Sequence, residues 1–191
     1  TFLLISCGGG GGGGSSPAPV PTPSNQAPAI SSSSTFSAAE NQTSIGSVTA
    51  SDPDGNSLTY SVSGSEINIS STGVLTFASA SDYETRNSYM ATVTVSDGSL
   101  SATQEITVSI TNENESPTIS SSSTFSAEEN QTSIGSVTAT DPDSDDLTYS
   151  ISGSEINISS SGELTFTSIP DYETKNSYTA TVTVTDGTLS V

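Results

Sequence analysis

The side chains best suited to chemistry in this sequence are its carboxylates. Among 191 residues there are 21 Asp and Glu, only two Lys and Arg, and no histidine, for a formal net charge of −19. Most of the acids fall in short motifs: AAEN and AEEN, DPD, DYE, DG, and NENE at 112–115. Oxygen ligands gathered in this way suit a hard cation such as Ca²⁺, which takes about six to eight of them.

The same composition excludes other functions. Two basic residues provide no positive surface for phosphates, so nucleic-acid binding is excluded, and attraction to an anionic membrane surface is disfavoured. Nucleophile–base pairs are almost unavailable without histidine. Paired carboxylates can hydrolyse glycosides, but a sugar site without tryptophan lacks its usual stacking platform. We therefore expect that this chain is not an enzyme.

An internal repeat of 89 residues organises the acidic motifs. NQTSIGSVTA at 41–50 returns unchanged at 130–139, and Asp52 corresponds to Asp141, since 141 − 52 = 89. Each copy consists of short runs of alternating apolar and polar residues, separated by turns rich in Asp, Pro, Gly and Asn. About seven such runs per copy predict an all-β fold of tandem Greek-key β-sandwiches.

The repeat divides the chain into four parts. Residues 26–116 form the first repeat and 117–191 the second, whose last strand is expected to be missing because Val191 corresponds to Ala102. Residues 8–25 are a Gly/Pro/Ser-rich linker. Residues 1–7 look like the cut end of a secretory signal peptide.

The motif LISC at 4–7 resembles the lipobox of bacterial lipoproteins. The resemblance implies that Cys7 is the lipidated N-terminus of the mature protein. A buried cysteine in a strand is the alternative, disfavoured because seven glycines follow. We expect a protein anchored by lipid in the bacterial envelope, at the outer membrane, with its ectodomain exposed to the medium.

The sandwich topology predicts where the acids meet. Alternate loops emerge at opposite ends, so DPD and DG lie where the chain enters a repeat, and AEN and DYE lie where it leaves. The exit of the first repeat then adjoins the entrance of the second, with NENE between them. Carboxylates facing one another without a counter-ion repel, and bound calcium relieves that repulsion.

DPD, DYE, VTVSDG and NENESP, in this order, resemble the cadherin repeat, in particular the cadherin-like repeats of bacterial surface proteins, over Asn25 to Val191. This implies a cadherin/Ig-like sandwich with calcium at the junction. The implied ligands are Glu40, Asp82, Glu84, Asn112, Asn114, Glu115, Asp141, Asp143 and Asp186. Weaker half-sites are implied at Asp52, Asp54 and Asp97, and at Glu129, Asp171 and Glu173.

This sequence departs from the cadherin pattern in the linker. Asn112 and Glu115 replace aspartates, and the linker is one residue shorter before Pro117. We therefore expect weaker binding, with two ions rather than three.

Plainer interpretations compete with calcium binding. Asp141, Asp143 and Asp145 suggest an EF-hand loop, but positions six and twelve are Asp146 and Ser152 instead of Gly and Glu. DPD alone is an ordinary turn, and its recurrence with DYE and NENE favours calcium. Glu66 and Glu155 are interpreted as solvated charges, and Arg86 and Lys175 are expected to pair with the DYE loops.

The leading hypothesis is a rod of calcium-stiffened repeats that mediates cell adhesion, through an unidentified surface protein or a like repeat. One alternative is a passive stalk that presents a C-terminal functional domain, possibly an enzyme. Another is a metal-independent array of Ig-like domains. Vertebrate-type exchange of an N-terminal tryptophan is not supported, because the chain contains none.

Overall fold

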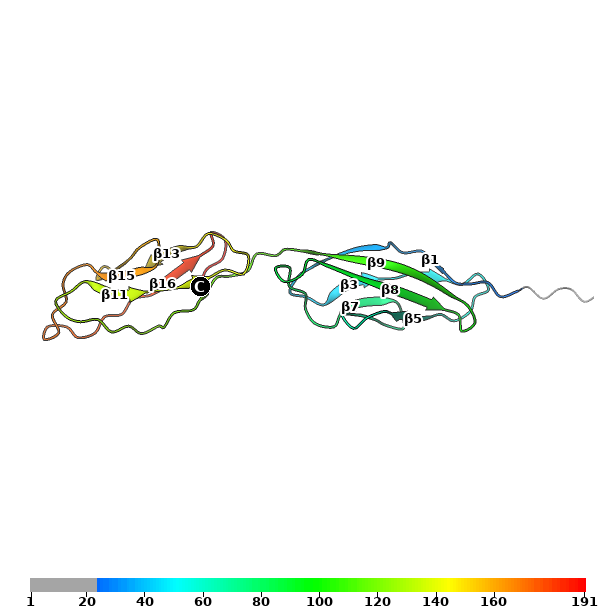
Figure 1. Ribbon diagram of the computed structural model, residues 1–191, viewed down its shortest axis with the longest axis horizontal. Helices are drawn as coiled ribbons and strands as arrows, with labels where there is room; N and C mark the ends of the chain where they lie inside the picture. The colour runs from blue at the N-terminus through cyan, green and yellow to red at the C-terminus, as the bar shows by residue number, and fades with distance from the viewer. Residues whose placement is uncertain (1–23) are drawn as a thin grey trace, which may run out of the picture.

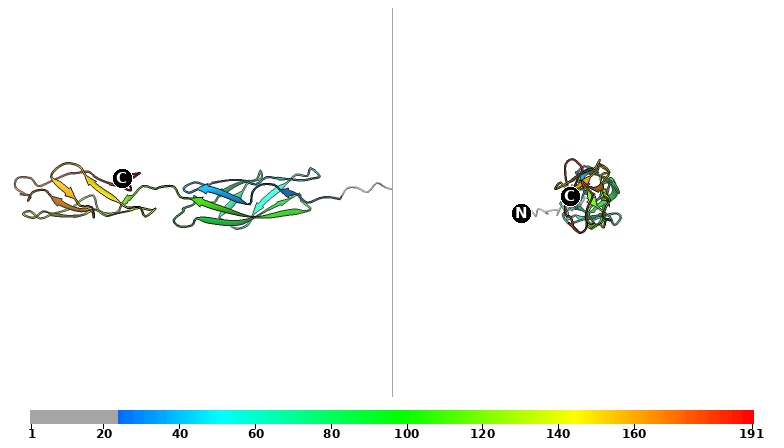
Figure 2. Two further views of the ribbon diagram at one scale, coloured as in Figure 1. Left: turned by 90° about the horizontal axis from the view of Figure 1, so that it is seen from above. Right: turned by 90° about the vertical axis from the view of Figure 1, so that its left-hand side faces the viewer.

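A computed structural model describes residues 24–191, which form two β-sandwiches arranged end to end as a rod (Figure 1). Viewed along the rod, the two units overlap in one outline (Figure 2). Cys7, the predicted signal-peptide remnant at 1–7 and nearly all of the predicted 8–25 linker lie outside the described residues. Within residues 24–191, no helix has the length and hydrophobicity that crossing a bilayer requires. The all-β prediction is confirmed.

The first repeat contains nine strands: β1 (Ala29–Ile30), β2 (Thr35–Ala39), β3 (Ser44–Ser47), β4 (Ala50–Ser51), β5 (Thr59–Val62), β6 (Ile67–Ile69), β7 (Val74–Phe77), β8 (Ser88–Ser96) and β9 (Ser101–Thr111). One sheet has the order β2-β9-β8-β5, in which β2 runs parallel to β9. The other has the order β3-β7-β6, and β1 pairs with β4. The number of strands exceeds the predicted seven because the first run is divided into β1 and β2, and the second run, at 44–51, into β3 and β4.

The core of the first repeat lies between its two sheets. Val93 and Val95 of β8, Ile106 and Val108 of β9, and Leu75 of β7 have no exposed surface. They occupy alternate positions, so the apolar residues of each strand face inward. Burial of each such side chain contributes about 1.5–3 kcal/mol relative to exposure.

The second repeat contains β10 (Thr118–Ile119), β11 (Ser133–Ser136), β12 (Ala139–Thr140), β13 (Thr148–Ile151), β14 (Ile156–Ile158), β15 (Glu163–Phe166) and β16 (Val182–Thr185). The sheets are β11-β15-β14, β13-β16 and β10-β12. Residues 124–128, which correspond to β2, form no strand here. The outer edge of β16 pairs only with the chain end, where Val184 and Val191 exchange two backbone hydrogen bonds.

The two repeats also share the backbone conformation of one glycine-containing turn. Gly73 and Gly162 both adopt φ +83°, and a Cβ at either would lie 2.2 Å from a carbonyl oxygen, of Val48 or Val137. Glycine is therefore required at this turn.

The two basic residues bind outside the DYE loops. Arg86 pairs with Glu66, and Lys175 pairs with Glu155. The expected pairing with the DYE loop is wrong, since each base reaches back to the acid that directly precedes β6 or β14.

Candidate metal centre

Glu40 joins the end of the first repeat to the linker. Its side chain lies just after β2 and is buried, with 3% of the residue exposed. One carboxylate oxygen accepts a hydrogen bond from the Tyr83 N–H at 2.7 Å, and the other accepts one from the Glu113 N–H at 2.9 Å. Such charge-assisted hydrogen bonds offset the desolvation of a buried carboxylate. Glu40 thereby holds the DYE loop and NENE against the same strand end.

Two more carboxylates approach Glu40. Glu84 of the DYE loop is exposed and Glu115 of the linker is half-buried, and one oxygen from each lies within 4.8 Å of the others and of one from Glu40. Asn41 donates its side-chain N–H to Glu115 at 2.9 Å. Neither of the two basic side chains neutralises this cluster, because Arg86 pairs with Glu66 and Lys175 pairs with Glu155.

The linker also binds the entrance of the second repeat. The Glu115 N–H donates to the Asp143 carboxylate at 2.7 Å, and the Asn114 side chain donates to Asp186 at 2.9 Å. The carboxylates of both repeats therefore meet at the linker, as the topology predicted.

A second acidic cluster lies in the turn after β12. Asp141, Asp143 and Asp145 each place one oxygen within 4.8 Å of the others. One oxygen of Asp141 and one of Asp143 are buried without a hydrogen-bond partner among the described residues. Buried acceptors of this kind need a donor, water or ion.

Sequence reasoning gave Asp145 no ligand role, because it was considered only within an EF-hand loop. The sequence of the turn could have indicated that Asp145 joins the cluster. The first repeat has DPDGNS, whereas the second has DPDSDD, with acids at alternate positions.

The pKa shifts record crowding of like charges. Partial desolvation raises the pKa of Glu84, and the nearby carboxylates of Glu40, Asp143 and Glu115 raise it further. Desolvation also raises the pKa of Asp145, with added repulsion from Asp141, Asp143 and Asp186. The pKa of Asp186 is instead lowered, first by the Asn114 hydrogen bond. Asp143 of the second cluster is among the charges that raise the pKa of Glu84, so the two clusters repel each other across the junction.

Two residues that the cadherin resemblance implies as ligands, Asp82 and Asn112, lie outside the carboxylate clusters. Asp82 uses its carboxylate within its own loop, accepting from the Thr85 N–H at 2.8 Å and from the Thr85 hydroxyl at 2.9 Å. Asn112 is exposed in the linker. Neither residue belongs to the carboxylate clusters of the described chain.

At the entrance of the first repeat, the uncharged residues Asn25 and Gln26 make the contacts that Asn114 and Glu115 make at the junction. Asn25 donates to Asp97 at 2.8 Å, and the Gln26 N–H donates to Asp54 at 2.7 Å. Asp52 accepts from the Asp54 N–H at 2.9 Å. Gln26 and Asn56 stand where Glu115 and Asp145 stand at the junction, so this half-site has two fewer carboxylates.

At the exit of the second repeat, Glu129, Asp171 and Glu173 form a third cluster within 4.8 Å, fully exposed. Glu129 accepts from the Tyr172 N–H at 3.3 Å, longer than the 2.7 Å bond that Glu40 accepts from Tyr83. This half-site is looser than the exit of the first repeat.

Comparison with known proteins matches both repeats to one family. Residues 25–111 and 114–191 each match the family described as bacterial Ig domain. The chain belongs to this family. Chitinase A of Pseudoalteromonas piscicida is 35% identical to it over 130 residues, which are 66% of this chain. The chain spans only 16% of the length of that curated relative.

Solved structures similar to these tandem bacterial Ig domains are cadherin ectodomains. Human protocadherin-24 EC1-2 gives a TM-score of 0.56 at 23% identity, covering 84% of this chain and 86% of that one. Drosophila N-cadherin EC1-4 gives 0.56 at 20% identity, covering 84% and 45%. Mouse cadherin-23 EC22-24 gives 0.51 at 26% identity, covering 78% and 56%. The resemblance to cadherin-like repeats is thus confirmed as one of fold.

Glu40→Gln tests the role of the buried carboxylate. The amide keeps the size but turns an NH₂ toward a backbone donor, so we expect the first repeat to lose about 1–3 kcal/mol of unfolding free energy. Denaturant unfolding in EGTA measures this loss. The matched control is Glu129→Gln, expected to change stability by less than about 0.5 kcal/mol because Glu129 is exposed. Equal losses in the two variants would contradict the assignment.

The raised pKa values of Glu84 and Asp145 predict a pH dependence in calcium-free buffer. The folded state binds these protons more tightly than the unfolded state does, so stability falls as the pH rises from the ordinary carboxyl range of about 4 to 4.5 through the raised pKa values. Asp186 does not oppose this trend there, because its lowered pKa affects stability only at more acidic pH. Melting curves across this range measure the slope. Glu84→Gln and Asp145→Asn should each flatten it, and a stability that increases with pH would refute the repulsion.

Proposed function

We propose that these tandem bacterial Ig domains bind calcium at their junction and form a stiffened, surface-exposed rod for adhesion or interaction. The supporting observation is the meeting of carboxylates from both repeats and the linker, without a basic side chain among them. Repulsion of this kind is relieved by a divalent cation with oxygen ligands.

The donor set fits calcium. Glu40, Glu84 and Glu115 supply oxygens on one side of the linker. Asp141, Asp143 and Asp145 supply oxygens on the other, including two buried ones that lack a partner among the described residues. Asp186 lies at the linker through its hydrogen bond from Asn114. Asn112, Asn114 and Asp82 are nearby oxygen donors in the sequence. Calcium accepts such a mixture of carboxylate and amide oxygens, and supplies the positive charge that these groups lack.

Bound calcium would restrict the bending of the two repeats about the linker. Residues 112–117 form no strand, so backbone pairing does not fix the angle between the repeats. The linker contacts to Glu40 and Asp143 already place ligands from both sides close together. With an ion shared across the junction, bending would separate ligands from it.

The affinity is expected to be low. Asn112 and Asn114 are neutral, so they contribute less attraction than aspartates would. Extracellular calcium modules have dissociation constants of about 10⁻⁴–10⁻³ M, and we propose this range, with two ions, for the junction.

We propose that Cys7 carries a lipid that anchors the rod to the outer membrane of a bacterium, with the repeats exposed to the medium. This rests on the LISC motif and on the Gly/Pro-rich tether that follows it. Two acyl signals hold a protein far more firmly than one does. The adhesion partner is a surface protein or a like repeat.

A passive stalk is the second candidate. It is favoured by the partial match to chitinase A, in which the similar region is a small part of a longer protein. In this candidate the repeats carry no catalysis, and they position another domain. The lack of histidine and tryptophan supports a non-catalytic role in both candidates.

Thermal unfolding with and without calcium tests the junction. A ligand bound only by the folded state stabilises it by about 2.7 kcal/mol at a hundredfold excess over Kd. We therefore expect millimolar calcium to raise the Tm relative to EGTA, and Asp141→Asn with Asp143→Asn to abolish the rise.

The matched control is Glu105→Gln with Glu163→Gln, which removes the same charge from exposed strand positions and should keep the calcium response. No change in Tm up to about 10 mM calcium, ten times the weak end of the expected range, would refute calcium binding at the junction.

A further inference from the structure

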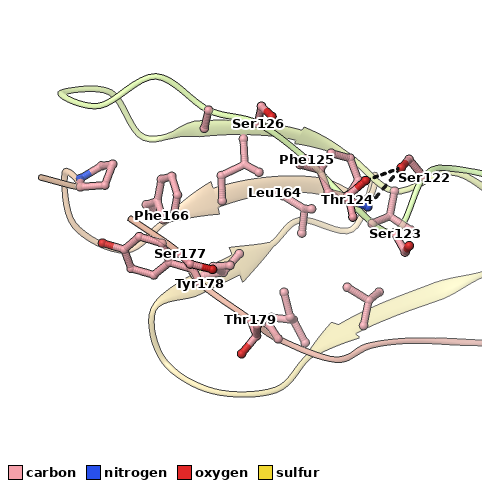
Figure 3. Close-up of a pocket in the computed structure, with 18 of the residues that line it drawn as sticks. Ser122, Ser123, Thr124, Phe125, Ser126, Leu164, Phe166, Ser177, Tyr178 and Thr179 are labelled. Carbon is pink, nitrogen blue, oxygen red and sulfur yellow. Dashed lines mark hydrogen bonds between the residues drawn. The ribbon is translucent and has the colours of Figure 1, made fainter. Parts of the chain in front are cut away.

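The entrances of the two repeats have the same backbone framework. At the first entrance β1 pairs with β4, with Ala29 opposite Ser51, and at the second β10 pairs with β12, with Thr118 opposite Thr140. The second pair lies 89 positions after the first. The pocket of the second repeat between residues 122–126 and 177–179 (Figure 3) is lined by none of the acids of its entrance. The two entrances can therefore be compared residue by residue.

Most polar contacts of the first entrance return at the second. Asn25 and its counterpart Asn114 each donate to the aspartate of the DG turn, at 2.8 Å and 2.9 Å. The N–H of the next residue donates to the second aspartate of DPD, at 2.7 Å in both repeats. One oxygen of Asp52 and one of its counterpart Asp141 are buried without a hydrogen-bond partner among the described residues. These groups do not distinguish the two entrances.

The difference lies two residues after DPD, at Asn56 and its counterpart Asp145. The side-chain N–H of Asn56 donates to the side-chain oxygen of Asn25 at 2.7 Å. Because Asn25 also donates to Asp97, two amides join the DPD turn to the DG turn. A carboxylate has no hydrogen to donate at this position. Within residues 24–191, no hydrogen bond joins the side chain of Asp145 to that of Asn114.

The grouping of the carboxylates differs accordingly. The three aspartates of the second turn each place one oxygen within 4.8 Å of the others. Among the described residues, the acids of the first entrance form no group of this kind. They are Asp52, Asp54 and Asp97. Desolvation, and then repulsion from Asp141 and Asp143, raise the pKa of Asp145, whereas Asn56 adds no charge to its turn.

We propose that the residue at this position determines which entrance binds a cation: Asn56 closes the first entrance with hydrogen bonds, whereas Asp145 completes a calcium ligand set at the second. The proposal rests on the calcium binding proposed for the junction. At the first entrance a cation would have to break the hydrogen bond between Asn56 and Asn25, and it would find two fewer carboxylates. The first entrance therefore keeps one conformation with and without calcium, and the calcium response is confined to the junction.

Calcium titration of the ¹⁵N-labelled chain, followed by ¹H–¹⁵N correlation spectra, observes both entrances in one experiment. We expect the signals of the Glu115 N–H and the Asn114 side chain to shift with a Kd of about 10⁻⁴–10⁻³ M. The signals of the Gln26 N–H and the Asn25 side chain should keep their positions in EGTA up to about 10 mM calcium, ten times the weak end of that range.

A substitution at the first entrance tests whether Asn56 is responsible. Asn56→Asp removes the donor and supplies a third carboxylate to the turn, so the Gln26 N–H signal should now shift with calcium. The matched control is Ser57→Asp, which adds the same charge at the next exposed position and should leave this signal unmoved. Well-dispersed spectra in EGTA verify that both variants are folded.

The reverse substitution tests the junction. Asp145→Asn should weaken calcium binding there by at least about tenfold, because the number of charged ligands sets the affinity of such sites. Asp146→Asn removes the same charge from the next residue, which is exposed and belongs to no carboxylate cluster of the described chain. Its effect should be less than about threefold, since exposed charges outside the site are screened.

Shifts of the Gln26 and Asn25 signals together with those of the junction would overturn the proposal and leave the proposed function standing. Absence of any shift at the junction would refute calcium binding there, and this assignment with it. Equal effects of Asp145→Asn and Asp146→Asn, or an Asn56→Asp entrance that does not respond to calcium, would overturn the assignment alone.

Discussion

Repulsion between carboxylates at the junction of the two repeats is the constraint on which the proposed function of this chain depends. The linker contacts both the exit of one sandwich and the entrance of the next, and the loops at both ends are acidic. Hydrogen bonds from the linker to Glu40, Asp143 and Asp186 hold these acids in place without neutralising them. The pKa values of Glu84 and Asp145 are raised, first by desolvation and then by repulsion from these neighbouring carboxylates. A bound divalent cation would neutralise this repulsion and link the two repeats through shared ligands.

Glu40 shows how one buried residue couples folding to this arrangement. Its buried carboxylate holds the DYE loop and the linker at the end of β2, so one side chain joins the first repeat to the junction. The second repeat has the same residue, Glu129, but it is exposed and its hydrogen bond is longer. Among residues 24–191, Glu40 thus accepts two backbone hydrogen bonds, from Tyr83 and Glu113, and Glu129 accepts one, from Tyr172.

Most of the architecture was predictable because the repeat, the period-two alternation and the turn residues all indicate the same sandwich. Alternating loop ends then sufficed to place Glu40, Glu84, Glu115, Asp143 and Asp186 at one junction. The role of Asp145 was missed, since it depends on how the DPDSDD turn curls back on itself. The partners of Arg86 and Lys175 depend on which way long side chains turn, which no spacing rule determines.

Small-angle X-ray scattering of the chain in EGTA and in millimolar calcium tests most directly whether calcium fixes the junction. The account predicts one elongated particle in calcium, and in EGTA a smaller average maximum dimension with the broader distance distribution of two units that bend at 112–117. Asp141→Asn with Asp143→Asn should give the EGTA profile in both buffers. Superimposable profiles of the unchanged protein in the two buffers would contradict the account, because the junction would then be equally rigid or equally flexible without the ion.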